Sequence, residues 1–259
     1  MKKIGIIGCG WLGLHIGKHL SNKYEIIATN RTAYNKSELQ SLGFKSFEIE
    51  FSDTEISNQN VNRSLLSDLD IVIITIPFSA KTDIDKLKNR FQNLSLFLKG
   101  FDKQIFLMSS IGVYPQIENE INEDTFDDNQ LNPNIFFVEN LIKSNFGQTN
   151  ILRLGGLMGA NRVFSNYKIT EPYQIVNHIH YQDICFVIEK MIDSCISEKI
   201  YNVVAPMHPT KNEIINYQQK IALNSIQETK YRRKILSTKL QKELEYEFIY
   251  PNPVKFTEI

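Results

Sequence analysis

The sequence of 259 residues is 42% hydrophobic and 22% charged, a composition that can build a sizeable core and argues against a largely disordered chain. Its 29 basic and 29 acidic residues give a formal net charge of zero, so composition favours neither nucleic acid nor an anionic membrane as a partner. The longest apolar run, around residues 71–78, is much shorter than the roughly 18 residues that a membrane helix needs. The three cysteines lack metal-ligand spacing, and without a signal-peptide pattern they indicate reduced thiols in a cytoplasmic protein.

The first expected element is an apolar strand at residues 4–7, which leads into a glycine turn and a helix. The turn, residues 8–13, has the pattern G-x-G-x-x-G between a strand and a helix, the context of a dinucleotide site. Gly8 permits the tight turn, Gly10 lets a pyrophosphate approach the backbone, and Gly13 lets the helix lie close to the sheet. Because the N–H groups at a helix start also attract anions, we expect cofactor contacts from Gly8, Cys9, Gly10, Trp11, Leu12 and Gly13. The alternative is a strand–helix turn without a ligand.

The end of the second expected strand indicates which dinucleotide binds. NAD sites usually place Asp or Glu about 20 residues after the glycines, where it holds the ribose 2′-hydroxyl. In this sequence that position is Asn30, and Arg31 and Thr32 follow it. Since a guanidinium suits a 2′-phosphate better than a bare hydroxyl, these three residues favour NADP, with NAD as the other possibility. The competing interpretation of Arg31 is an ordinary exposed loop arginine.

The rest of the chain alternates between strand and helix patterns. Residues 70–76 form a continuous run rich in β-branched side chains, as expected for a parallel strand covered on both faces. The apolar residues of 84–98 recur at steps of three and four, which predicts an amphipathic helix. We expect further strands at 44–49, 104–108, 150–154 and 200–204, and further helices at 34–42, 133–146, 184–192 and 210–222, the last with a capping box at Thr210 and Glu213.

Alternating elements of this kind predict an α/β fold, namely a Rossmann-type, doubly wound parallel sheet with a small C-terminal substrate lobe. We assign residues 1–155 and 175–205 to the NAD(P)-binding domain, and residues 156–174 and 206–259 to the lobe. Ligands of such sheets bind beyond the carboxyl ends of the strands. That rule adds three residues near strand ends to the predicted cofactor contacts: Thr75, Pro77 and Ser109.

Several later segments carry a family pattern. Residues 109–114 read Ser-Ser-Ile-Gly-Val-Tyr, and Glu123 and an Asn-Pro pair at 132–133 follow. Residues 152–159 contain the pattern R-x-x-x-x-x-G, and residues 180–183 read His-Tyr-Gln-Asp. Together these segments resemble the extended short-chain dehydrogenases/reductases, a group that includes the NAD(P)-dependent sugar-nucleotide epimerases and dehydratases. The resemblance implies an oxidoreductase or epimerase that acts on a sugar nucleotide or a related small hydroxy or carbonyl substrate.

One departure from that family concerns its catalytic pair. Working members use Tyr-x-x-x-Lys, with the tyrosine as general acid/base, and the usual spacing from Pro133 puts these positions at Phe137 and Leu141. No tyrosine lies between Tyr114 and Tyr167, yet a hydride transfer needs a matching proton transfer. One hypothesis is an enzyme with relocated catalytic groups, for which the candidates are Ser109, Ser110 and Tyr114. The other is a catalytically silent NADP(H)-binding sensor or regulatory protein.

Other polar residues allow two interpretations each. A histidine at 178 or 180 could serve as a base near neutral pH. In the structural interpretation, which is the simpler one, His180 ties a loop to the next helix start and Asp183 caps that helix. Arg153 and Arg162 could bind substrate anions, but each could equally form an ion pair.

The predicted partners are few. The basic cluster at residues 230–234 is short, and we expect it to be a solvated face or a linker rather than a nucleic-acid site. A small-molecule substrate is the partner that the resemblance implies, and a homodimer is possible because members of the family often dimerise. Neither nucleic acid nor a membrane is expected.

Overall fold

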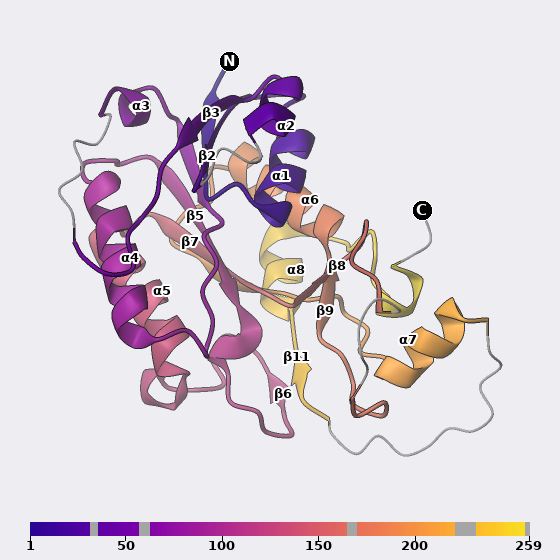
Figure 1. Ribbon diagram of the computed structural model, residues 1–259. Helices are drawn as coiled ribbons and strands as arrows, with labels where there is room; N and C mark the ends of the chain where they lie inside the picture. Colours follow the sequence, from indigo (N-terminus) through magenta and orange to yellow (C-terminus); the bar gives the residue numbers. More distant parts are fainter. Residues whose placement is uncertain (32–35, 57–62, 165–169, 221–231, 257–259) are drawn as a thin grey trace.

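The computed structural model describes residues 1–31, 36–56, 63–164, 170–220 and 232–256 (Figure 1). Thr32, one of the predicted cofactor contacts, lies outside the described residues. Strands and helices alternate along the described chain, as the sequence predicts. None of the described helices is long and apolar enough to cross a membrane.

In the described part of the chain, the core is a parallel sheet of seven strands in the order β10-β7-β5-β4-β1-β2-β3. β1 and β4 are neighbours in this sheet, and the strand order reverses between them. Such a switch point is where doubly wound sheets bind ligands, and the topology confirms the predicted fold class. The strands are β1 (Lys3–Ile7), β2 (Glu25–Asn30), β3 (Lys45–Glu48), β4 (Ile71–Ile74), β5 (Gln104–Ser110), β7 (Thr149–Leu154) and β10 (Ile200–Val203).

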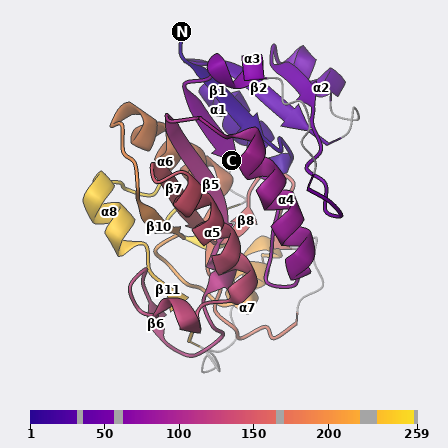
Figure 2. The same ribbon diagram turned by 90° about the vertical axis from the view of Figure 1, so that its left-hand side faces the viewer.

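Helices cover both faces of the sheet and make a three-layer fold (Figure 1, Figure 2). All four residues of β4 are buried because both of its faces are covered, which explains the unbroken apolar run in the sequence. One face packs against α1 (Trp11–Leu20), α2 (Lys36–Ser41), α6 (Tyr181–Asp193) and α8 (Thr238–Leu244). The other face packs against α3 (Arg63–Ser67), α4 (Ile84–Phe97) and α5 (Pro133–Asn145).

Two helix starts follow recognisable capping chemistry. α4 begins after Asp83, whose carboxylate accepts from two backbone N–H groups of the first turn. α7 (Lys211–Gln218) opens on the predicted capping box, in which the Thr210 side chain accepts from the Glu213 N–H. This helix ends earlier than the sequence suggests, because Lys220 adopts a left-handed φ of 56°.

The sequence predicts neither of two short parallel strand pairs. β6 (Glu120–Ile121) pairs with β11 (Lys234–Ile235), and β8 (Gly156–Met158) pairs with β9 (His178–His180). Strands of two or three residues are too short to display an alternating pattern. Near α7, a separate buried apolar cluster contains Met158, Phe164, Val176, Ala205, Ile214 and Phe256. The division of the chain into a Rossmann domain and a small lobe stays a prediction.

The predicted capping role of Asp183 is wrong. Asp183 is completely buried inside the first turn of α6, and the N-cap residue is His180, which makes no side-chain capping bond. The Asp183 carboxylate instead accepts from the Tyr246 hydroxyl at 2.7 Å and from the N–H groups of Ile249 and Tyr250 at 2.8 and 3.1 Å. It therefore fixes the C-terminal segment on α6, a contact between residues too distant in sequence to be predicted locally.

His180 is a buried histidine in the same region. Its side chain is 1% exposed, and its ring centroid lies 3.8 Å from that of Tyr250. Within the described residues, neither ring nitrogen of His180 has a hydrogen-bond partner. Burial lowers the pKa of His180 to about 4, because the charged ring would lose its water without gaining a partner.

We expect the protein to lose stability as the pH falls from neutrality towards 4. In this range the unfolded chain binds a proton at His180 that the folded chain does not, since the unfolded pKa is about 6.5 and the folded pKa about 4. His180 alone should therefore make the free energy of unfolding in urea about 2 kcal/mol lower at about pH 5 than at neutral pH. His180→Asn should lose less stability over the same interval, and an equal loss in variant and wild type would contradict this assignment.

Candidate functional site

The three glycines of the turn between β1 and α1 meet three different steric demands. Gly8 has a φ of 82°, and a Cβ there would lie 2.8 Å from the Ile76 side chain. A Cβ on Gly13 would lie 2.9 Å from the Thr75 hydroxyl, so the helix can approach the sheet this closely only with glycine. At Gly10 the nearest atom to a Cβ would be 3.9 Å away, which leaves this side open. The geometry fits a pyrophosphate at the start of α1.

Two threonines hold the turn in place. The Thr75 hydroxyl, a predicted cofactor contact, donates to the Gly8 carbonyl at 2.8 Å. Thr29 Oγ1 accepts from the Gly8 N–H at 3.1 Å, and the Thr29 carbonyl accepts from the Cys9 N–H at 2.7 Å. Thr29 lies inside a strand pattern, so the sequence gives no signal for this role. Burial raises the pKa of the Cys9 thiol to about 12, which keeps the sulfur protonated and unreactive.

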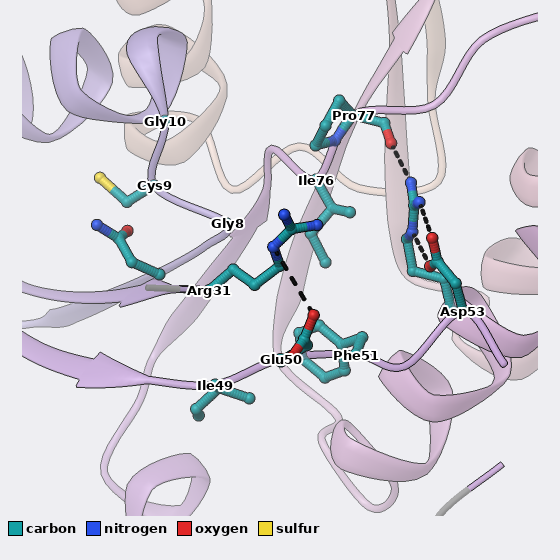
Figure 3. Close-up of a pocket in the computed structure, with 12 residues that line it drawn as sticks. Gly8, Cys9, Gly10, Arg31, Ile49, Glu50, Phe51, Asp53, Ile76 and Pro77 are labelled. Atoms are coloured by element: carbon teal, nitrogen blue, oxygen red, sulfur yellow. Dashed lines mark hydrogen bonds and ion pairs between the residues drawn. The ribbon is translucent and has the colours of Figure 1, made fainter. Parts of the chain in front are cut away.

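A cavity of about 300 Å³ opens beside this turn, at the carboxyl ends of β1, β2 and β4 (Figure 3). Six predicted cofactor contacts line it: Gly8, Cys9, Gly10, Asn30, Arg31 and Pro77. Ile76, which the strand-end rule selects together with Thr75 and Pro77, also lines it, and the sequence did not indicate the other five lining residues, which are Ile49, Glu50, Phe51, Asp53 and Arg90. The remaining described contacts, Trp11, Leu12, Gly13, Thr75 and Ser109, lie outside this lining. Ile49 to Asp53 follow β3, so the strand-end rule could have found them.

Asn30 and Arg31, which were expected to select the dinucleotide, differ in how firmly the fold holds their side chains. With its amide nitrogen turned towards carbonyl oxygens, Asn30 donates to Cys9 O at 2.9 Å and so ties β2 to the glycine turn. The Arg31 side chain is 72% exposed, and its Nε lies 3.7 Å from Glu50 Oε1. An exposed ion pair of this length is weak, so an incoming phosphate can replace the Glu50 carboxylate.

One wall of the cavity is fixed by an ion pair. Arg90 donates through Nε and Nη2 to the two carboxylate oxygens of Asp53 at 2.7 and 2.6 Å, and through Nη1 to the Pro77 carbonyl at 2.8 Å. The Arg90 hydrogen bonds lower the pKa of the Asp53 carboxyl, so it stays ionised. The Asn89 and Asn93 side chains donate to carbonyls of residues 52–55. Helix α4 therefore holds this wall rigidly against the ends of β3 and β4.

Two of the predicted catalytic side chains lie in a buried polar network. Ser109 Oγ donates to Glu139 Oε1 at 2.5 Å, and the Glu139 carboxylate pairs with the Arg153 guanidinium at 2.7 Å. Arg153 Nη1 donates to the Tyr114 hydroxyl at 2.9 Å, and that hydroxyl donates to Asn202 Oδ1 at 2.8 Å. Tyr114 is only 2% exposed, and burial raises its pKa. Arg153 is thus an internal ion-pair partner rather than a free anion-binding group.

Ser110 differs from its neighbour. It is the last residue of β5 and is half-buried, and its Oγ accepts from the Gly112 N–H at 3.0 Å. Among the described residues, no acceptor takes the Ser110 hydroxyl proton. The Ser110 hydroxyl can therefore donate its proton to a ligand beyond the end of the sheet. The hydroxyls of Ser109 and Tyr114 already donate theirs to Glu139 and Asn202.

Helix α5 presents no tyrosine or lysine to these serines. Phe137 and Leu141, where the family spacing places the catalytic pair, pack against the core on the α4 side of the sheet. Two α5 residues contact the serine segment: Glu139, bonded to Ser109, and Ile135, whose Cδ1 would lie 3.2 Å from a Cβ on Gly112. On the side of the helix that contacts Ser109 and Gly112, the side chains are therefore a carboxylate and an aliphatic group, and not the tyrosine and lysine of the family.

The second histidine considered as a base, His178, lies apart from this network. It faces Gly156, where a Cβ would be 2.7 Å from the imidazole ring. Its Nδ1 has no hydrogen-bond partner among the described residues, and burial lowers the pKa of His178 to about 4. The ring is therefore neutral at pH 7, and protonating it at that pH costs free energy because the charged ring would be buried away from water.

The basic cluster near the end of the chain is not simply a solvated face. Arg233 is buried, and its guanidinium donates to the carbonyls of Ile111 and Pro115 at 2.8 and 3.0 Å. Asn177 in turn holds the backbone of this segment by accepting from the Ile235 N–H at 2.8 Å. The expectation of a solvated linker is wrong for Arg233, which anchors the loop that follows Ser110.

Comparisons with known proteins agree with this architecture. No family model matches the chain. It is 25% identical over 272 residues to Protein YeeZ of Escherichia coli (strain K12), covering 98% of both chains. It resembles the structure of a putative NAD-dependent epimerase/dehydratase from Methylobacillus flagellatus, with a TM-score of 0.72, 21% identity and coverage of 98% and 96%. It also resembles UDP-glucuronic acid 4-epimerase from Bacillus cereus in complex with UDP-glucuronic acid and NAD, with a TM-score of 0.74, 16% identity and coverage of 98% and 96%.

The predicted resemblance to the extended short-chain dehydrogenases/reductases is thereby confirmed at the level of the fold. The likeness extends over nearly the whole chain, from the glycine turn to the C-terminal segment fixed by Asp183. Substrate and chemistry are properties of side chains at the site, which the shared fold does not determine.

Glu139→Gln should destabilise the protein strongly. The change leaves the buried Arg153 guanidinium without a countercharge, and breaking one partner of a buried ion pair costs about 3–5 kcal/mol. Denaturant unfolding of the purified variant measures this loss. Glu198→Gln, an exposed carboxylate near the same edge of the sheet, is the matched control and should change stability by less than about 0.5 kcal/mol. Similar losses in the two variants would contradict a central role for the pair.

Proposed function

We propose that this protein binds NADP(H) in the cavity at the switch point of the sheet. The observation that carries the proposal is the convergence of three separate stretches, residues 8–10, 30–31 and 76–77, on one cavity. The first turn of α1 offers its free backbone N–H groups to a pyrophosphate, and Arg31 offers a guanidinium to a 2′-phosphate. Ile49, Phe51 and Ile76 supply the apolar lining that an adenine needs.

The choice between NADP and NAD rests on two residues of opposite charge. Arg31 favours a 2′-phosphate, which it can bind through two parallel hydrogen bonds. Glu50 would repel that phosphate but could accept a hydrogen bond from the 2′-hydroxyl of NAD. Since the two side chains are largely exposed and 3.7 Å apart, Arg31 can leave Glu50 without uncovering a buried charge. We therefore favour NADP.

Substitutions at these two positions should shift the cofactor preference in opposite directions. Arg31→Gln should weaken NADP⁺ binding by about ten-fold or more, because charge-assisted hydrogen bonds are lost, and should affect NAD⁺ little. Glu50→Gln should strengthen NADP⁺ binding, since the carboxylate no longer opposes the phosphate. Isothermal titration calorimetry measures the six affinities, those of the wild type and of both variants for each dinucleotide. A wild-type preference for NAD⁺ that Arg31→Gln leaves unchanged would exclude the NADP assignment.

We further infer an oxidoreductase or epimerase of the epimerase/dehydratase type, acting on a sugar nucleotide or a related small hydroxy or carbonyl compound. The likeness to UDP-glucuronic acid 4-epimerase over nearly the whole chain supports this inference. A bound nicotinamide would supply the hydride transfer. Among the proposed catalytic residues, Ser110 would hydrogen-bond the substrate oxygen, while Ser109 and Tyr114 would keep its strand end in position.

A second candidate function is a catalytically silent NADP(H)-binding sensor or regulatory protein. The observation in its favour is that the Tyr114 hydroxyl is enclosed by Arg153 and Asn202. A proton donor must exchange with substrate, and a tyrosine whose pKa burial has raised is poorly suited to that task. This function needs the cofactor cavity alone. A cytoplasmic location and a homodimer remain proposals that are compatible with both functions.

Turnover distinguishes the two candidates. Purified protein is incubated with NADP⁺ or NADPH and a panel of nucleotide sugars and small carbonyl compounds, and product is followed by absorbance and chromatography. If the protein is an enzyme, Ser110→Ala should lower kcat by about ten-fold or more while the affinity for NADPH stays unchanged. Ser144→Ala, an exposed serine on α5, is the control. NADPH binding without turnover of any compound would favour the sensor, and turnover abolished by Tyr114→Phe would exclude it.

A further inference from the structure

A tight turn at residues 159–162 places an arginine beside the start of α1. Gly159 and Arg162 exchange two backbone hydrogen bonds, each 3.0 Å long, and Gly159 and Ala160 both have a positive φ. Asn161 Oδ1 accepts from the Trp11 indole N–H at 2.9 Å. The Arg162 guanidinium carbon lies 4.0 Å from the centroid of the Trp11 ring. This turn follows β8, and these contacts attach it to Trp11, the first residue of α1.

The surface on which Arg162 rests is itself well fixed. Trp11 makes edge contacts with His15 and Tyr181, at centroid distances of 4.8 and 5.8 Å. Stacking on this ring limits where the guanidinium can lie, and it leaves the N–H groups around the guanidinium edge available. An arginine held in this way loses less rotamer entropy on binding a ligand than a free one does.

No direct ion pair within the described residues balances the positive charge of Arg162, and the Glu38 carboxylate of this region pairs with Lys18 at 3.8 Å instead. Among the described residues, no carboxylate lies within ion-pair distance of Arg162. The first turn of α1 contains no acidic residue, and its N-cap residue Gly10 has no side chain to satisfy the free N–H groups. A half-buried guanidinium therefore stands near the positive end of a helix dipole, an arrangement that an anion stabilises.

We propose that Arg162 binds the diphosphate of the dinucleotide, opposite the free backbone N–H groups at the start of α1. The inference rests on the proposed cofactor site and adds to it a contact from the distant segment 159–162. The Trp11 ring and Asn161 orient the arginine, and the diphosphate supplies the direct counter-charge that no described carboxylate provides to Arg162. Cofactor binding and the position of this turn are therefore coupled.

The test compares two adenine nucleotides that differ in where their phosphates lie. ADP carries the diphosphate, whereas adenosine 2′-monophosphate reaches only the Arg31 end of the cavity. Calorimetric titration of the full chain should show that Arg162→Gln lowers the affinity for ADP by about ten-fold or more. The affinity for the 2′-monophosphate should change by less than about two-fold. Arg162→Lys should be intermediate, because it keeps the charge but loses the planar fork. Lys242→Gln, which removes an exposed positive charge on α8, should bind both ligands as the wild type does.

Three outcomes would overturn the proposal in distinguishable ways. Unchanged ADP affinity in Arg162→Gln would exclude the contact while leaving the proposed function intact. Equal weakening of both nucleotides would assign Arg162 a structural role only. Wild-type protein that binds neither ADP nor NADP⁺ would refute the cofactor site itself. Trp11 is the single tryptophan of the chain, so its fluorescence gives an independent readout, and we expect ADP to change its emission.

Discussion

The buried ion pair between Glu139 and Arg153 is the interaction on which the centre of the fold depends. Both side chains are almost wholly removed from water, at a cost of several kcal/mol for each ion that only close contacts can offset. The offset comes from doubled hydrogen bonds between the two groups and from the hydroxyls of Ser109 and Tyr114. The pair thus joins α5, β5 and β7, and through Asn202 it reaches the edge strand β10.

This network also limits the chemistry that the protein can perform. The hydroxyls of Ser109 and Tyr114 are used to solvate buried charges, and a group in that role cannot leave it without exposing those charges to an apolar core. Ser110, the last residue of β5, is outside the network and only accepts from the Gly112 N–H. The structure therefore separates residues that maintain the strand end from a residue that is available to a ligand.

Much of the fold could be read from periodic or local signals. The glycine turn, the apolar run at β4 and the spacing in α4 each reflect a constraint within a few residues, and the capping box of α7 does so as well. The Arg90–Asp53 clamp and the Asp183 contacts could not be read in this way, because they join residues that only the folded chain brings together. Arg90, on α4, was missed from the cavity lining for the same reason, whereas the lining residues of 49–53 follow β3 and lay within reach of the strand-end rule. The strand-end rule located the site, but it could not identify the α4 side chain that fixes one of its walls.

The anchoring of the serine segment by Arg233 has a consequence for the order in which the protein assembles. The cavity lining lies between residues 8 and 90, whereas the loop after Ser110 depends on an arginine more than 110 positions further along the chain. Contacts over so long a separation carry a large loop-closure entropy and form late in folding. During synthesis the cavity's residues emerge well before Arg233 does, so we infer that the dinucleotide site takes shape on the nascent chain first. The segment that would meet a substrate becomes ordered only when the last quarter of the polypeptide docks.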